Sequence, residues 1–347
     1  MRRWVKAAVA TAALLGVSGW IAEPYARDWM LTGSACDGAL PREAVGQLRP
    51  EDTHLAEESS RLTEALGSYA CNLALDGEGL LVRMEAHTRR DDQDSSFMQT
   101  FSREGWAWQA PLPEGMPGFI DRHGAIQIVL PCRELGEDDN GRPRKLLVRT
   151  QFGRESLTGV PGAAYRTVVA LANSASERLG CGAERLEPPE TGAVPAEPGD
   201  DPESFPVPRA KGTPCEWVTR ADLPESLDWR FAAAMNDAAP TGRCELFAGD
   251  GDEDSFAGEA LEEDALEQWD RISLAAWYGD WSNRLTTWDG KRRSGTATAR
   301  CDGEAANFAI SAPDDIPGID AAVERRLLKS FAEDQVRRRG CSDLRIF

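Results

Sequence analysis

The chain lacks the signatures by which common enzyme classes are recognised. It contains no GxSxG elbow, no SxxK or HExxH motif and no GxxxxGK[ST] phosphate loop, which argues against the hydrolases, metalloproteases and nucleotide-binding folds that these motifs mark. Only three histidines occur in 347 residues, His54, His87 and His123, and the glycines of DGEGLL lack the third member of a dinucleotide fingerprint. We therefore predict a protein that is not an enzyme and has no cofactor or metal site.

Basic residues are scarce relative to acidic ones. The chain has 39 Lys and Arg against 58 Asp and Glu, a net charge of −19. Without Arg2, Arg3 and Lys6, which precede an apolar stretch, the remainder carries 36 − 58 = −22. This excess of negative charge argues against nucleic acid and anionic lipid surfaces as partners. We attribute it to solubility outside the cytoplasm, with recognition of a cationic ligand as the alternative.

Long apolar runs are absent except at the N-terminus, where residues 7–22 read AAVATAALLGVSGWIA. The stretch reaches 19 residues if it starts at Trp4 and Lys6 snorkels, which is about the length that spans a bilayer. Preceding positive charges hold that end in the cytoplasm. We therefore predict that residues 1–30 form a signal-anchor or transmembrane segment in the cell membrane, with the C-terminal bulk extracellular.

Two alternatives to a retained anchor remain open. Val17 and Gly19 form a weak cleavage site, so the chain could be secreted after signal cleavage. Lipidation at Cys36 has less support. Leu31 stands five positions before this cysteine, whereas a lipid-attachment box needs a leucine three positions before it. Trp20, Tyr25 and Trp29 suit the outer membrane interface, where amphipathic rings settle.

Eight cysteines fall into two successive sets of four, separated by a proline-rich stretch. Successive gaps are 35, 61 and 49 positions in the first set and 29, 57 and 40 in the second, so short, long and medium gaps recur in the same order. No CxxC pair occurs, which argues against zinc and redox sites. Paired cysteines persist outside the reducing cytosol. The cysteines are Cys36, Cys71, Cys132, Cys181, Cys215, Cys244, Cys301 and Cys341.

Residues around the cysteines recur as well. LPREAVGQL follows the first cysteine of one set and ADLPESLDW that of the other, and each has a proline that could open a helix. GAIQIVLPC and GTATARC alternate like strands. Two helical segments begin after VPG and IPG and stop at Gly180 and Gly340. We therefore predict a tandem duplication.

Four cysteines allow three pairings in each half of the chain. We favour first with second and third with fourth, since these bridges would tie helices to strands at matching places. Loops of this size would each contribute about 3 to 4 kcal/mol in the chain-entropy model. The favoured pairs are Cys36 with Cys71, Cys132 with Cys181, Cys215 with Cys244, and Cys301 with Cys341.

The predicted architecture is α+β, with two duplicated disulfide-stapled modules over residues 31–186 and 213–347. Residues 187–212 hold seven prolines and should form an extended linker. In the first module, SYACNLAL with LLVRMEAHT and GAIQIVLPC with KLLVRTQF predict two hairpins of an antiparallel sheet with packed helices.

The second module departs from this plan. After CELFA we find no clear second strand, so we expect a shorter sheet, or a helix in place of a strand. The core would then be filled by the tryptophans of this half, although exposed rings that bind a sugar or a peptide are the alternative. These tryptophans are Trp217, Trp229, Trp269, Trp277, Trp281 and Trp288. Asp250, Asp252 and Asp254 start a calcium-like loop, but Ser255 and Leu261 stand where glycine and glutamate are required. We expect a solvated acidic turn there.

The pattern resembles the small disulfide-bonded exported domains of uncharacterised actinobacterial membrane proteins and lipoproteins. The likeness rests on a membrane segment, the helix start at Leu40 and Pro41 after a cysteine, a cysteine in a strand, and a closing helix ending in Gly180 and Cys181. It implies an exported binding role and no functional residue. We therefore expect a membrane-tethered extracytoplasmic binding or interaction protein, with a cell-envelope protein or glycan as partner. The alternatives are a structural spacer and, less favoured, an envelope hydrolase.

Overall fold

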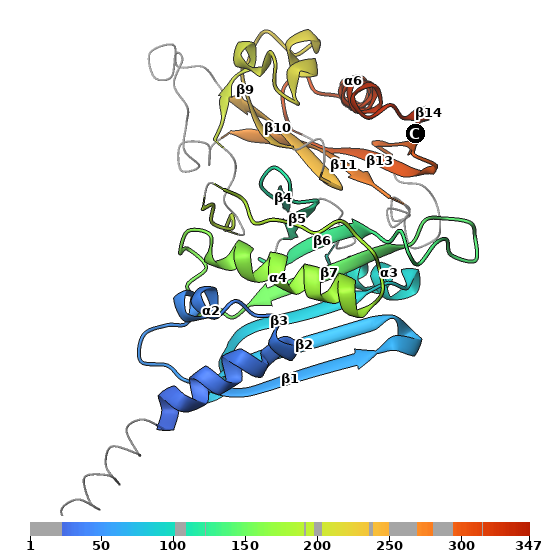
Figure 1. Cartoon of the computed structure of the whole chain (residues 1–347). Coiled ribbons are helices and arrows are strands. Elements are labelled where there is room, and N and C mark those ends of the chain that lie inside the picture. The colour runs from blue at the N-terminus through green and yellow to red at the C-terminus, as the bar shows by residue number, and fades with distance from the viewer. Residues whose placement is uncertain are drawn as a thin grey trace, which may run out of the picture. The chain divides into compact units, whose positions relative to one another are not determined.

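The computed structural model describes residues 23–100, 109–121, 123–190, 192–197, 203–235, 239–249, 269–279, 294–313 and 315–347 (Figure 1). Within these ranges, no helix combines the length and apolar character needed to cross a membrane. The apolar stretch 7–22 of the expected signal-anchor (1–30) and the acidic turn at 250–254 lie outside them, whereas residues 23–30 of that anchor are part of a helix that continues to residue 38. Six of the eleven tryptophans also lie outside the described ranges, namely Trp4, Trp20, Trp106, Trp108, Trp281 and Trp288.

The first sheet has seven antiparallel strands in the order β1-β2-β3-β7-β6-β5-β4. The strands are β1 Leu55–Thr63, β2 Ser68–Leu75, β3 Leu80–His87, β4 Gln109–Pro111, β5 Gly118–Asp121, β6 Ile126–Pro131 and β7 Lys145–Phe152. The helices are residues 23–38, α2 Arg42–Leu48, α3 Arg90–Thr100 and α4 Ala163–Arg178, with short 3-10 turns η1 Glu64–Leu66 and η2 Asp76–Glu78. This confirms both expected hairpins and the helix that closes the first module.

The second sheet also has seven antiparallel strands, in the order β14-β12-β13-β11-β10-β9-β8. The strands are β8 Phe205–Pro206, β9 Asp228–Met235, β10 Thr241–Gly249, β11 Asp270–Tyr278, β12 Thr296–Cys301, β13 Glu304–Ser311 and β14 Ser342–Ile346. They are accompanied by α6 Ala321–Arg339 and the 3-10 turns η3 Val207–Ala210 and η4 Glu216–Arg220. α6 begins where Asp320 accepts bonds from the N–H groups of Ala322 and Val323 and ends at Gly340, whose φ is 64°.

Five strands of each sheet share one order. The first sheet runs β1-β2-β3-β7-β6 and the second β9-β10-β11-β13-β12, so each has a three-stranded meander followed by the next hairpin in reverse. Cys71 lies in β2 and Cys244 in β10, and a long helix follows β7 in one case and β13 in the other. The described chain is therefore an α+β structure with two antiparallel sheets.

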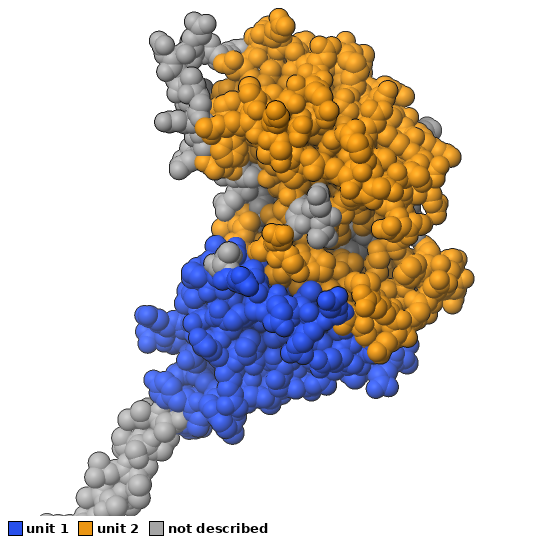
Figure 2. Space-filling model, turned by 45° about the horizontal axis from the view of Figure 1, so that its top comes forward, with its two compact units in different colours: residues 1–86, 148–180, 184–194 blue, residues 87–147, 181–183, 195–347 orange. Residues whose placement is uncertain are grey.

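By compactness the chain divides into two units (Figure 2). Unit 1 comprises residues 1–86, 148–180 and 184–194, and unit 2 comprises residues 87–147, 181–183 and 195–347. In unit 1, α2 packs against α4, and Arg166 of α4 donates to Gln47 Oε1 at 2.5 Å. The buried stripe of α4 includes Ala164, Val168 and Leu171, as its sequence predicts.

The core of unit 2 forms where α6 and η4 cover one face of the second sheet. Phe331 of α6 meets Trp217 of η4 and Phe308 of β13, with ring centroids 5.8 and 6.2 Å apart. β10 is buried on both faces, because Cys244 and Leu246 join this core while their neighbour Glu245 on the other face is also covered. The strand alternation therefore fixes which side chains meet α6.

Four disulfides are present, and their pairs are the ones that the spacing favours. They join Cys36 to Cys71, Cys132 to Cys181, Cys215 to Cys244 and Cys301 to Cys341, with Cα–Cα distances of 5.2, 4.3, 6.0 and 4.2 Å.

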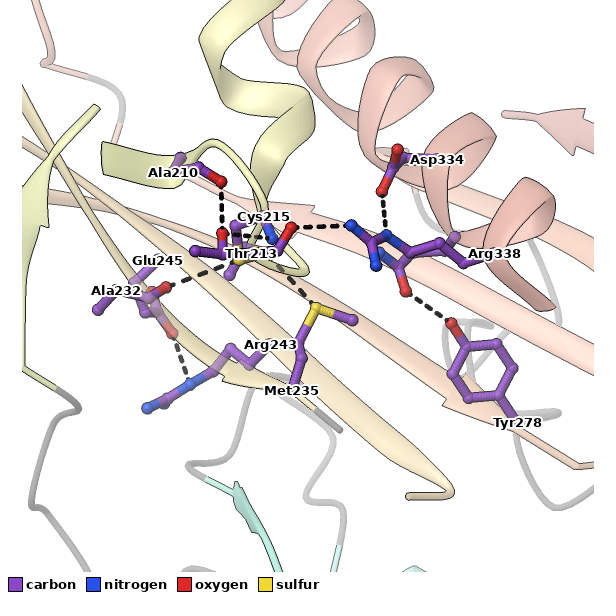
Figure 3. The surroundings of a disulfide bond; sticks show 12 residues. Ala210, Thr213, Cys215, Ala232, Met235, Arg243, Glu245, Tyr278, Asp334 and Arg338 are labelled. Carbon is purple, nitrogen blue, oxygen red and sulfur yellow. Dashed lines mark hydrogen bonds and ion pairs between the residues drawn. A yellow bond between two sulfur atoms is a disulfide. The ribbon is translucent and has the colours of Figure 1, made fainter. Parts of the chain in front are cut away.

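Figure 3 shows the third disulfide and its surroundings. Cys215 N donates to Thr213 Oγ1 at 3.2 Å, and Thr213 O accepts from Arg338 of α6 at 2.8 Å. Asp334 in turn accepts from Arg338 at 2.9 Å. The turn that carries Cys215 is thus bonded both to β10 and to the helix above it.

The second module differs from expectation in two places. The strand that we expected to be missing is present as β11, which pairs with both β10 and β13. ADLPESLDW does not form a helix: η4 is a single 3-10 turn, residues 221–227 are irregular, and β9 begins at Asp228. Trp217 and Trp277 are buried, but they pack on a complete sheet and do not replace a strand. The proline-rich stretch ends in β8, which pairs with β9.

Candidate functional site

A pocket of about 170 Å³ in unit 2 collects charged side chains on two walls. We call it the charged pocket. One wall is the start of α3, and the other is the turn between β6 and β7 with the first residue of β7. Its lining consists of Thr88, Arg89, Arg90, Asp91, Gln93, Asp138, Asp139, Asn140, Arg142, Pro143, Arg144 and Lys145.

Gln93 fastens the helical wall of the charged pocket. Its side-chain nitrogen donates to His87 O at 2.8 Å and to Lys145 O at 2.7 Å. His87 ends β3 and Lys145 begins β7, so one buried amide joins the first turn of α3 to two strand ends. This contact holds Arg89 and Arg90 at the mouth of the pocket.

Asp138 organises the opposite wall. Its carboxylate accepts hydrogen bonds from the N–H groups of Asn140 and Arg142 at 2.9 and 3.1 Å, and from Arg142 Nε at 2.9 Å. Gly141 completes the turn with a φ of 71°, a conformation that glycine adopts without strain. The hydrogen bond from the Arg142 side chain is the largest cause that lowers the pKa of Asp138 to about 2.

Ion pairs continue from this turn as a chain. Asp138 Oδ2 lies 2.8 Å from Arg142 Nη2 and 3.5 Å from Arg90 Nε. Arg90 also lies 3.9 Å from Glu304, which pairs with Lys145. Glu304 begins β13, so the last carboxylate of this series of ion pairs comes from the second sheet.

The charged pocket is locally basic in an acidic protein. Five of its lining side chains are cationic and three are anionic, whereas the whole chain carries −19. Arg89 is exposed, and the described residues supply no partner for its guanidinium. Arg144 uses Nε on Glu137 O at 3.1 Å. Planar guanidinium groups hold carboxylates and phosphates with paired hydrogen bonds, so the pocket can hold an anionic group.

Proton transfer fits this pocket poorly. A general acid needs a pKa raised toward neutrality, whereas the pKa of Asp138 is lowered to about 2. No histidine, serine or cysteine lines the pocket, whose walls all belong to described residues. In the part of the chain that the structure describes, no cluster of three or more metal-binding side chains occurs. The arrangement is suited to binding.

A second charged cluster lies in unit 1, on helix 23–38. Burial acts to raise the pKa of Asp28, but hydrogen bonds outweigh it and lower the pKa. They come from His54 Nδ1 at 2.8 Å, from Leu55 N at 2.7 Å and from Arg49. No nucleophile is among these partners, and their effect is to fasten the helix to β1.

Sequence reasoning missed both charged clusters. GEDDNGRPR reads only as a polar turn, and the residues that complete the charged pocket come from one distant segment, residues 88–93, and from Lys145. All eight predicted cysteines are placed in disulfides, and none of them lines the charged pocket. The available signal was a turn between two strands in which three acidic residues are followed by two arginines.

Comparison of the chain with protein-family models, with curated proteins and with solved structures finds no match.

Proposed function

We propose that the chain is a membrane-tethered extracytoplasmic binding protein whose ligand site is the charged pocket. The observation that carries the proposal is the pocket itself, with five cationic side chains in a chain of net charge −19. Local charge of the sign opposite to that of the whole protein is expected where an anionic ligand group is bound. The apolar residues 7–22 supply the tether, and the four disulfides fit an oxidising compartment.

Duplication is part of the proposal. The shared order of five strands, the matching positions of the disulfides and the long helix after β7 and β13 are what two copies of one ancestral module would retain. All residues that line the charged pocket belong to the first module. Ligand binding would thus belong to one copy.

The ligand group must be small. Pockets that enclose a drug-sized molecule have about 300 to 1,000 Å³, whereas this one has about 170 Å³. We therefore propose that it takes one carboxylate or phosphate of a larger envelope glycan or protein. Arg89, which has no partner among the described residues, would supply the first contact.

Isothermal titration calorimetry on the full chain in nanodiscs tests this proposal. The probes are glucuronate and glycerol phosphate, with glucose as the uncharged control. A charge-assisted hydrogen bond is worth about 1.5 to 3 kcal/mol, so Arg89→Ala should weaken anion binding about tenfold or more. Arg220→Ala is the matched control, because Arg220 is also exposed in unit 2 but lies outside the pocket. Absence of anion binding, or equal loss in both variants, would overturn the proposal.

A structural spacer without ligand is the second candidate. Residues 187–189 and 192–197 of the proline-rich region form neither helix nor strand, as a spacer segment would. The titration separates the two functions, since a spacer binds neither anion. Shortening residues 187–197 should then change the phenotype of cells more than Arg89→Ala does.

A further inference from the structure

Helix 23–38 is held firmly to unit 1 by one face. Asp28, Thr32, Ala35 and Cys36 are buried at the spacing of a helical stripe. Asp28 is bonded to three groups of the following segments, and Cys36 is bridged to Cys71 in β2. The orientation of the exposed side chains of this helix is therefore fixed by the fold of unit 1.

Helix 23–38 also exposes large apolar side chains: Tyr25 and Trp29, one turn apart, lie at the side of the buried stripe, and Met30 lies farther round the helix. Tyr25 and Trp29 are each 62% exposed, and Met30 is 58% exposed. These three lie within six consecutive residues, whereas the other exposed large apolar side chains of the described chain are scattered. The others are Leu62, Leu66, Leu157, Val194 and Phe347. Single exposed apolar residues are ordinary on a protein surface, but a cluster marks an interaction surface.

Both rings are positioned by neighbours. Arg42 lies over the Trp29 ring at 4.4 Å, and the Tyr25 ring meets His54 edge-on at 5.3 Å. Arg27 lies on the same helix, between the two rings in sequence, and donates to Ala56 O of β1. The surface thus combines two amphipathic aromatic rings, a thioether and two guanidinium groups. Tyr and Trp settle at the headgroup level of membranes, where their rings meet apolar chains and their polar atoms meet water.

The position of this surface along the chain identifies its partner. Helix 23–38 directly follows the apolar residues 7–22. With a rise of about 1.5 Å per residue, Trp29 stands about 9 Å along the helix axis from Glu23. The polar layer of a bilayer is about 5 to 8 Å deep on each side. A chain anchored by residues 7–22 therefore cannot carry Tyr25 and Trp29 far from the lipid headgroups.

From this we propose that helix 23–38 is an interfacial element, which lies in the outer headgroup layer with Tyr25, Trp29 and Met30 in contact with phospholipid. The inference rests on the membrane tether of the proposed function. Unit 1 is then held at the membrane by a folded surface in addition to the span. The arginines face lipid phosphates, while the net charge of −19 makes a zwitterionic surface a better partner than an anionic one.

Fluorescence quenching by brominated lipid tests the inference. The full chain is reconstituted in phosphatidylcholine vesicles whose acyl chains carry bromine near the headgroup. Trp4, Trp20 and Trp29 are the tryptophans expected near the membrane, so Trp29→Phe should remove part of the bromine-quenchable emission. Trp29→Tyr keeps an amphipathic ring and gives the same readout if the phenylalanine variant folds poorly. Trp229→Phe, which alters a half-buried ring of unit 2, should leave the quenchable emission unchanged.

Vesicle flotation distinguishes failure of the tether from failure of the inference. If the full chain does not float with the vesicles, the membrane tether of the proposed function is wrong, and the inference falls with it. If the chain floats but quenchable emission is the same in the wild type and in both Trp29 variants, the tether stands and the interfacial helix is wrong. Loss of quenchable emission in the Trp29 variants alone supports the inference.

Discussion

Lys145 and Glu304 form an ion pair between residues 159 positions apart. Lys145 is the first residue of β7 and Glu304 the first residue of β13, and these strands occupy the same place in the shared order of the two sheets. The pair thus joins equivalent positions of the two sheets within unit 2. The side chains are 27% and 10% exposed, so solvent screens them less than it screens a surface pair.

This pair should contribute measurably to stability. Lys145→Ala leaves a mostly buried carboxylate with Arg90 at 3.9 Å as its remaining cation, and we expect a loss of about 1 to 3 kcal/mol. A double-mutant cycle with Glu304→Gln, measured by urea unfolding, should give a coupling energy of about 0.5 to 3 kcal/mol.

The surface pair of Lys329 and Glu333 on α6 is the matched control. Its side chains are 60% and 52% exposed, so the same cycle should give about 0.3 to 0.5 kcal/mol. A coupling between Lys145 and Glu304 no larger than this would contradict the view that their contact stabilises unit 2.

The carboxylate of Asp138 should keep its charge and its hydrogen bonds down to acidic pH. Folding lowers the pKa of Asp138 from 3.8 to about 2, so the carboxylate stabilises the folded state fully above about pH 4, and this contribution disappears as the pH falls toward 2. Asp138→Asn should therefore be less stable than the wild type at neutral pH, and the difference should shrink between pH 4 and pH 2.

Carboxyl-carbon NMR titration of Asp138, together with urea unfolding of both proteins at each pH, measures this effect. Asp139→Asn is the control, because Asp139 adjoins Asp138 in the same turn and also lines the charged pocket. A midpoint for Asp138 near 4, or a stability difference that does not depend on pH, would be incompatible with the ion-pair chain.

Removing a disulfide should destabilise the chain by an amount set by its loop. Cys301 and Cys341 enclose a separation of 40 residues, for which the chain-entropy model gives about 4 kcal/mol. Cys301→Ala combined with Cys341→Ala should lose about this much in urea unfolding, provided that the packing of α6 on the sheet is retained.

Peptide mass spectrometry without reduction provides the check on connectivity. It should recover four bridges, each between cysteines of the same set of four. A bridge between the two sets, or bound metal in place of a bridge, would refute the arrangement.

The sequence predicted elements whose local pattern matches their environment. GAIQIVLPC and KLLVRTQF carry branched apolar residues of high strand propensity, and they form β6 and β7. The two closing helices have an apolar stripe and a glycine stop, and both are present as α4 and α6. In these segments local preference and burial agree.

Prediction failed where burial overrides local preference. β9 reads DWRFAAAM and β11 reads DRISLAAWY, and their alanines favour helix when taken alone. They are held as strands by β10 between them, which is buried on both faces. The charged pocket was missed for a related reason. Contacts such as that of Arg90 with Glu304 depend on the topology of the strands, and the local sequence around either residue does not indicate them.

The four bridges join each cysteine to the next one along the chain. If the residues after the anchor emerge in sequence order, the first, third, fifth and seventh cysteines each meet their native partner before any other new thiol emerges. An oxidase that pairs thiols in order of arrival would make only native bonds, and slow reshuffling of wrong pairs would be unnecessary. The consecutive connectivity is thus compatible with oxidation in order of synthesis, without reshuffling of bonds.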